Sequence, residues 1–299
     1  MDKKILIIAP NGGFGNRLRT MINAIYLAKK LNMDIQHLWL GTEFKCMYDH
    51  IQYIHDKSFE YFFKPTIKGY DYINMKNTIK KVYSEWFPGN FWYNYQSYGQ
   101  RLLNIDNICE LNLVNEEMNK SEDFLIETSF INNLKITDEE KHKIYKNYFI
   151  PTDIFINKLE LLPENTIGIS IRRNEFSYYF PESEIDKDII INWLTSIENP
   201  VLLFSDDKEY QEEMQKHLKI PIIPNYESIP HEDNFFLSFL QLSKCSKLYG
   251  TYMSSFCQEA AYFGGVEYVP LKKDFFINCY IIFIIFKINI LFFKLFYTF

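Results

Sequence analysis

The sequence has no surplus of positive charge. Its 299 residues include 32 Lys and Arg against 38 Asp and Glu, which gives a formal net charge of -6. Proteins that bind nucleic acid through its phosphates gather Lys and Arg on one face. The acidic balance therefore argues against broad nucleic-acid binding, and any phosphate-binding site must be local.

Cysteine is scarce, and its spacing excludes two common kinds of site. The five cysteines are odd in number and contain no CxxC pair: Cys46, Cys109, Cys245, Cys257 and Cys279. A disulfide framework needs paired cysteines, and a zinc site needs closely spaced ligands. We therefore expect reduced thiols and no zinc.

Long hydrophobic runs are missing from most of the chain. The run Ile5 to Ala9 is shorter than the roughly 7 to 15 apolar residues of a signal peptide, so we expect a cytoplasmic protein. The segment from residue 274 to 299 is apolar, but its uncharged run Phe275 to Phe286 is shorter than the roughly 20 residues of a spanning helix. Three interpretations stay open: a C-terminal membrane anchor, a buried or interfacial element, and a segment without function.

What the chain does contain is an alternation of strands and helices. The apolar run Lys4 to Pro10 predicts a strand, the helical spacing over Asn16 to Leu31 predicts a helix, and Ile35 to Leu40 predicts a second strand. This order opens a parallel, Rossmann-like sheet. Residues 45 to 150 are rich in aromatic side chains, and their weak periodicity leaves the sheet untraced there.

The alternation resumes after Pro163. Strands are expected at 166–171, 201–204, 222–223, 247–249 and 266–269, and helices at 187–197, 208–218, 233–243 and 254–263. The sequence thus predicts an α/β protein with two Rossmann-like domains facing a central cleft, at 1–155 and 156–273, followed by the hydrophobic tail.

A glycine-rich loop lies between the first strand and the first helix. Gly13, Gly15, Asn16 and Arg17 belong to the run GGFGNR, where backbone can approach a ligand and the helix offers free N–H groups to an anion. Leu18 stands where a dinucleotide fingerprint has its third glycine, which disfavours an NAD site. A turn that needs glycine for its dihedral angles is the alternative interpretation.

Three further polar segments follow predicted strands, at the edge where α/β sheets bind ligands. The segment SIRRNE contains Ser170, Arg172 and Arg173, and guanidinium groups can bind a diphosphate and stabilise a leaving group's charge. A salt-bridged strand edge is the alternative. Asp206 and Asp207 could accept hydrogen bonds from a ribose or a base, and they could equally cap a helix.

The last of these segments is Ser254-Ser255-Phe256, which opens a helix and could direct two hydroxyls at phosphate oxygens; helix capping explains it as well. The DxD sequence at Asp186 to Asp188 also opens a helix, where acidic residues need no metal. We therefore expect no metal site.

These motifs, in this order, resemble those of the fucosyltransferase superfamily that includes the α1,2-, α1,6- and protein O-fucosyltransferases. Gly13 to Leu18 is similar to the family's G-x-G-N-[QR]-L element, and Ser170 to Glu175 to its H-x-R-R-x-D donor motif. The run from Asp233 through Cys245 to Phe256 is similar to the segment that closes the donor domain.

The resemblance implies a GT-B fold, an inverting transfer from GDP-fucose to a hydroxyl of a glycan or protein acceptor, and no metal cofactor. It assigns the β-phosphate to Arg172 or Arg173, the phosphates to Ser254 and Ser255, the guanosine to Asp206 or Asp207, and a donor contact from the other domain to Asn16. Two departures concern the donor: Ser170 stands where the family commonly has His, and Glu175 replaces Asp.

No residue stands out as the general base, and Glu43, near the end of the second predicted strand, is our candidate. Three other functions stay open: a GT-B transferase that uses another nucleotide sugar, a non-catalytic nucleotide- or glycan-binding protein of the same fold, and a dehydrogenase. Membrane contact through the tail is a further expectation.

Overall fold

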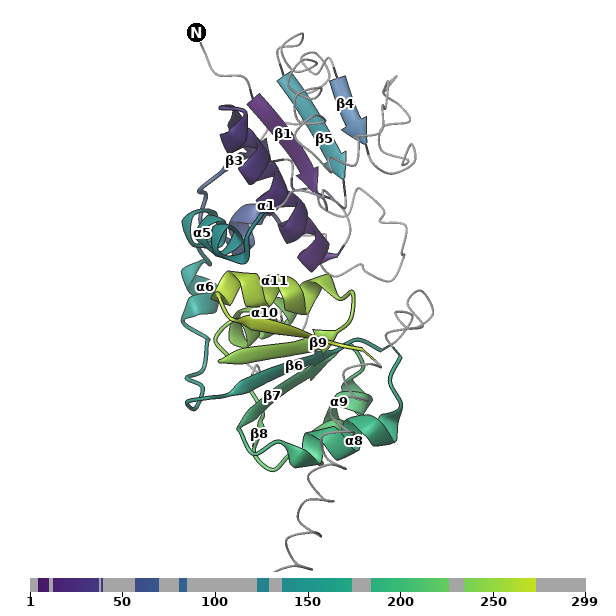
Figure 1. The fold of residues 1–299 in the computed structure, drawn as a ribbon. Helices are drawn as coiled ribbons and strands as arrows, with labels where there is room; N and C mark the ends of the chain where they lie inside the picture. Colours follow the sequence, from purple (N-terminus) through teal and green to yellow (C-terminus); the bar gives the residue numbers. More distant parts are fainter. Residues whose placement is uncertain are drawn as a thin grey trace, which may run out of the picture. The chain divides into compact units, whose positions relative to one another are not determined.

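The computed structural model describes residues 5–10, 13–37, 39, 57–69, 81–84, 123–128, 136–173, 184–225 and 234–272. These residues form two compact units (Figure 1). The first takes the described residues within Met1–Glu160, Tyr226–Ser243 and Tyr262–Gly265, and the second takes those within Leu161–Asn225, Lys244–Ala261 and Val266–Phe299. Glu43, Glu175, Asp233 and the tail lie outside the described residues.

The first unit contains a parallel sheet of five strands in the order β3-β2-β1-β5-β4. Its strands are β1 (Ile5–Pro10), β2 (Asp34–His37), β3 (Lys68–Gly69), β4 (Lys81–Ser84) and β5 (Asp123–Thr128). The expected strands around 4–10 and 35–40 are confirmed. Strands β3, β4 and β5 were not predicted, and they lie within the aromatic-rich region.

The helices of the first unit surround an aromatic core. They are α1 (Phe14–Lys30), α2 (Phe59–Phe62), α5 (Asp138–Tyr148), α6 (Asp153–Ile156) and α10 (Asn234–Leu242). Phe14 is 2% exposed, and its ring centroid lies 5.4 Å from that of Phe236 and 5.3 Å from that of Phe239. Helix α10 therefore completes the core of the first unit, although it lies far along the chain.

The second unit contains a parallel sheet in the order β10-β9-β6-β7-β8. Its strands are β6 (Ile167–Ile171), β7 (Val201–Ser205), β8 (Pro221–Ile222), β9 (Lys247–Thr251) and β10 (Glu267–Leu271). From β6 the chain proceeds outward through β7 to β8, and then returns to pair β9 with the other side of β6. The strand order therefore reverses between β6 and β9, which is where doubly wound sheets bind ligands.

Helices cover both faces of this sheet (Figure 1). Helices α8 (Lys187–Ser196) and α9 (Lys208–Gln215) pack through Ile190, Leu194 and Met214 against Ile169 and Leu203 of the strands. Helix α11 (Ser255–Gly264) approaches the opposite face, where a Cβ on Gly250 would lie 2.7 Å from the Cβ of Cys257. Glycine at position 250 thus allows helix and strand to pack closely.

The expected elements of the second half are all present, within a few residues of their predicted ends. The fold is α/β, with two Rossmann-like units, as the sequence predicts. Within the described ranges, no helix is long and apolar enough to cross a membrane.

Candidate functional site

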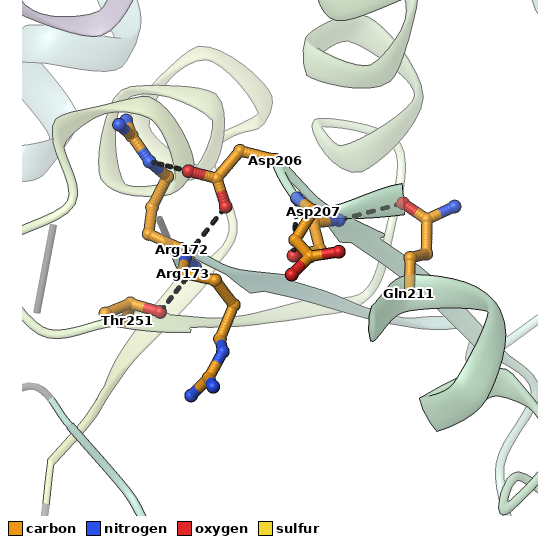
Figure 2. A network of polar contacts seen from close by, with 7 residues as sticks. Arg172, Arg173, Asp206, Asp207, Gln211 and Thr251 are labelled. Carbon is orange, nitrogen blue, oxygen red and sulfur yellow. Dashed lines mark hydrogen bonds and ion pairs between the residues drawn. The ribbon is translucent and has the colours of Figure 1, made fainter. Parts of the chain in front are cut away.

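Three neighbouring strands of the second sheet bring polar residues to one carboxyl edge. Arg172 and Arg173 follow β6, Asp206 follows β7, and Thr251 ends β9. Figure 2 shows these side chains gathered at the strand ends. The edge lies at the reversal of strand order, so the fold places the arginines where a ligand is expected.

The carboxylate of Asp206 contacts both arginine residues (Figure 2). Its Oδ2 accepts a hydrogen bond from Nε of Arg172 at 2.9 Å, and its Oδ1 accepts one from the backbone N–H of Arg173 at 2.7 Å. The side chains of Arg172 and Asp206 are 32% and 25% exposed. The salt-bridged strand edge considered for the arginines is thus present, and it leaves Arg172 accessible from solvent.

The backbone of Arg172 is held from the other side of β6. Its N–H donates to Oγ1 of Thr251 at 2.8 Å, and Thr251 is buried. No local motif singles out Thr251 in the sequence, because its position relative to Arg172 is set by strand pairing. The pairing of β6 with β9 brings the two residues together.

The guanidinium of Arg173 points away from that of Arg172 (Figure 2). Its Cζ lies 4.7 Å from the ring centroid of Tyr210, within the range of a cation–π interaction. Burial raises the pKa of Tyr210, and the nearby positive charge of Arg173 opposes that shift. The two arginines therefore occupy different environments, which adjacent sequence positions did not indicate.

Asp207 caps helix α9. Its Oδ1 accepts a hydrogen bond from the backbone N–H of Tyr210 at 2.9 Å, and its own N–H donates to Oγ of Ser205 at 3.2 Å. The backbone N–H of Ser205 donates to Oε1 of Gln211 at 2.8 Å. The capping interpretation of the Asp206-Asp207 pair therefore holds for Asp207, while Asp206 binds the arginine segment.

Ser254 lies where the loop after β9 meets α11. It is 1% exposed, and its Oγ has no hydrogen-bond partner within the part of the chain that the structure describes. The preceding residue, Met253, is 52% exposed and has φ 66°, which is uncommon for a residue with a side chain. Ser255 and Phe256, both partly buried, form the first turn of the helix.

Ser170 lies within β6, two residues before Arg172, and is 5% exposed. Its register partner in β9 is Gly250, which borders α11, so Ser170 belongs to the same side of the sheet as this helix. Its role as a donor contact stays a prediction.

The glycine-rich motif forms the start of α1 in the first unit. Gly13 is the N-cap residue with φ -66° and ψ 164°, and a Cβ built there would meet no atom of the described residues within 4 Å. Any residue can adopt these angles, so the dihedral explanation for glycine does not hold at Gly13. Gly15 is buried in the first turn, and Asn16 is partly exposed beside it.

Arg17 is 2% exposed, whereas Arg19, Arg172 and Arg173 are partly exposed. Its Cζ lies 5.1 Å from the ring centroid of Trp39, which follows β2. Burial of the whole side chain supports a positioning or packing role for Arg17 in the first unit.

The DxD sequence is explained by helix capping. Oδ1 of Asp186 accepts hydrogen bonds from the backbone N–H groups of Asp188 and Ile189, at 2.9 and 3.4 Å. Among the described residues, no group of three or more His, Cys, Asp and Glu side chains could hold a metal ion.

The two doubly wound sheets define a GT-B-like protein, and comparisons with solved structures give the same fold. POFUT1 in complex with GDP-fucose is similar with a TM-score of 0.57 and 12% sequence identity, over 90% of this chain and 96% of that chain. The fucosyltransferase NodZ from Bradyrhizobium is similar with a TM-score of 0.59 and 14% identity, over 92% and 96%. No protein-family model and no curated protein matches the sequence.

Proposed function

We propose that this protein is an inverting glycosyltransferase that moves fucose from GDP-fucose to a hydroxyl of a glycan or protein acceptor. The observation that carries the proposal is the pair Arg172-Arg173 at the reversal of strand order in the second sheet. The solved structures of similar fold support the choice of donor, since POFUT1 and NodZ structures hold GDP-fucose or were soaked with it.

The chemistry at this edge suits a nucleoside diphosphate leaving group. The acceptor oxygen attacks the anomeric carbon of the sugar, the bond from that carbon to the β-phosphate oxygen breaks, and negative charge accumulates on the diphosphate. Guanidinium groups stabilise such charge best when they are held in place before the reaction. Arg172, fixed by Asp206 and Thr251, fits this requirement.

The start of α11 offers a second contribution to diphosphate binding. A helix N-terminus presents backbone N–H groups that have no partner in the helix, and anions bind there readily. Ser254 adds a buried hydroxyl whose oxygen has no partner among the described residues. In our proposal Ser254 and Ser255 donate to phosphate oxygens, as the resemblance implies.

The glycine-rich start of α1 lies in the first unit and presents the backbone N–H groups of a helix N-terminus. The described residues leave open space around Gly13, which gives room for a ligand at this helix N-terminus, and Asn16 is partly exposed in the first turn. We propose Gly13, Gly15 and Asn16 as donor contacts from this unit. Glu43 stays the candidate base that accepts the proton of the acceptor hydroxyl.

Calorimetric titration tests the donor. The full chain is titrated with GDP, UDP, GDP-fucose and NAD, and compared with Arg172→Ala/Arg173→Ala. We expect the unchanged protein to prefer the guanine nucleotides and the double variant to lose roughly 100-fold or more in affinity, because two charged hydrogen-bond donors are removed.

The matched control is Lys187→Ala/Lys219→Ala, which removes two cations of the same unit that pair with Glu213 and Glu198. This control should bind GDP like the unchanged protein. Equal binding of UDP or NAD, or unaltered GDP binding by the arginine variant, would contradict the proposal. Donor binding without sugar transfer to any tested acceptor would instead favour a non-catalytic nucleotide-binding protein.

A further inference from the structure

The resemblance to fucosyltransferases implies a guanosine contact for Asp206 or Asp207, yet both carboxylates have partners within the protein. Asp207 caps α9, and each oxygen of Asp206 accepts a hydrogen bond from the arginine segment. We propose that Asp206 is a positioning residue that holds the Arg172 guanidinium for the donor diphosphate and does not read the nucleoside. This inference rests on the proposed function.

Two neighbouring strands fix Arg172 from opposite sides. On the β7 side, Asp206 binds Nε of the Arg172 side chain and the backbone N–H of the next residue. On the β9 side, Oγ1 of Thr251 accepts a hydrogen bond from the backbone N–H of Arg172 itself. Three hydrogen bonds thus fix the backbone and the side chain of one short segment just beyond the end of β6.

The position of the contact on the guanidinium matters. Asp206 binds through Nε, while a guanidinium carries five N–H donors in a planar fork. A carboxylate at Nε fixes the plane of the fork, and the terminal nitrogens are the donors that bind phosphate oxygens in bidentate fashion. The contact with Asp206 therefore orients the Arg172 guanidinium before the diphosphate binds.

The contact between Asp206 and Arg172 should matter more for ligand binding than for folding. A long arginine side chain loses rotamer freedom when it binds a ligand, and prior fixation reduces that loss. A single ion pair between side chains that are 32% and 25% exposed contributes little to folding stability. Replacement of Asp206 should therefore weaken diphosphate binding far more than it lowers the melting temperature.

A double-mutant cycle tests the inference by calorimetric titration with GDP and GMP. Asp206→Asn should weaken GDP binding about 10-fold, because Arg172 loses a charged hydrogen-bond acceptor. In the Arg172→Ala background the same change should alter GDP affinity by less than about 2-fold, because Asp206 then has no guanidinium to position. GMP, which lacks the β-phosphate, should be affected much less than GDP.

Two further variants control for charge and for folding. Asp206→Glu keeps the charge but moves the carboxylate, so it should also weaken GDP binding if geometry matters. Glu213→Gln removes an ion pair with Lys187 elsewhere in the same unit and should leave GDP affinity unchanged. Melting temperatures of all variants are measured in parallel.

Additive losses for Asp206→Asn and Arg172→Ala, an equal loss for GMP and GDP, or tighter GDP binding by Asp206→Asn would each overturn the positioning role. In a protein that binds GDP, those results would leave the proposed donor intact. If the unchanged protein binds no guanine nucleotide, the proposed function fails and the positioning role fails with it.

Discussion

The imidazole of His142 lies against the carboxyl end of α11, with Nδ1 3.0 Å from the carbonyl oxygen of Tyr262 and 3.1 Å from that of Phe263. Both partners are acceptors, so the geometry assigns a hydrogen to Nδ1. The last carbonyls of a helix have no partner within it, and a side-chain donor satisfies them. His142 on α5 therefore caps the carboxyl end of α11, where Tyr262–Gly265 belong to the first unit.

We expect His142→Ala to lower the free energy of unfolding by about 1 to 2 kcal/mol, because two partly buried carbonyls lose their donor. Urea-induced unfolding followed by circular dichroism measures this loss. Asn147→Ala, at an exposed position of the same helix, is the control and should change stability by less than about 0.5 kcal/mol. Equal stability of both variants would mean that the contact does not stabilise the helix end.

Gly13 provides a prediction that separates function from folding. Gly13→Ala should change the melting temperature little, since its φ is -66°, a Cβ meets no atom of the described residues within 4 Å, and the lower unfolded-chain entropy of alanine offsets its poorer N-cap preference. The added methyl group occupies the space that we assign to a ligand, so GDP-fucose binding should weaken about 10-fold. Differential scanning calorimetry and titration measure the two effects.

Gly264→Ala is the contrasting variant. Its Cβ would lie 2.1 Å from the backbone carbonyl oxygen of Ser243, which cannot move without shifting the chain after α10. We expect a loss of about 3 kcal/mol or more in folding stability. If Gly13→Ala is destabilised to a similar extent, or binds GDP-fucose normally, the assignment of open space at Gly13 to a ligand is wrong.

The stability of the first unit should fall in mild acid because of His37. Burial lowers the pKa of His37, which is 4% exposed, and the nearby Glu60 only partly opposes this shift. Nε2 of His37 lies 3.4 Å from Oε1 of Glu60, the ring of Phe59 packs at 4.5 Å between centroids, and the backbone of Ile67 also contacts the imidazole. A lowered pKa means that the unfolded chain binds the proton more tightly than the native protein.

The melting temperature should therefore decline as the pH falls below about 6.5, the usual value of a histidine pKa. In His37→Gln the decline between pH 7.5 and 5 should be smaller, whatever the melting temperature at neutral pH. In Glu60→Gln it should be larger, because the carboxylate that raises the pKa is gone. If the melting temperatures of all three proteins fall by the same amount between pH 7.5 and 5, His37 does not contribute to the pH dependence of stability.

Much of the fold followed from local sequence. The apolar runs of β6, β7 and β9 predicted strands, and the helical spacing of apolar residues in α1 predicted a helix. A strand or helix that packs against a core shows these patterns of apolar residues whatever its partner is. Strands β3, β4 and β5 could not be predicted, since their region is rich in aromatic residues and shows no clear period. In such a region, hydrogen bonding to neighbouring strands of the sheet determines which residues form a strand.

Local sequence also determined which residues follow the strands of the second sheet, and hence that Arg172, Asp206 and Ser254 are candidates for one site. The polar segments after β6, β7 and β9 could be identified in the sequence and assigned to one edge of the sheet, because the carboxyl ends of parallel strands lie at a common edge. The chemistry of these side chains then favoured a diphosphate ligand.

Only the tertiary structure decided how those residues are used. The strand order places β7 on one side of β6 and β9 on the other, so that Asp206 binds Arg172 across 34 residues and Thr251 binds it across 79. Likewise, α10 joins the aromatic core of the first unit through contacts between Phe236 and Phe14. Such partners are brought together by strand pairing and core packing, which depend on the whole chain and leave no local pattern in the sequence.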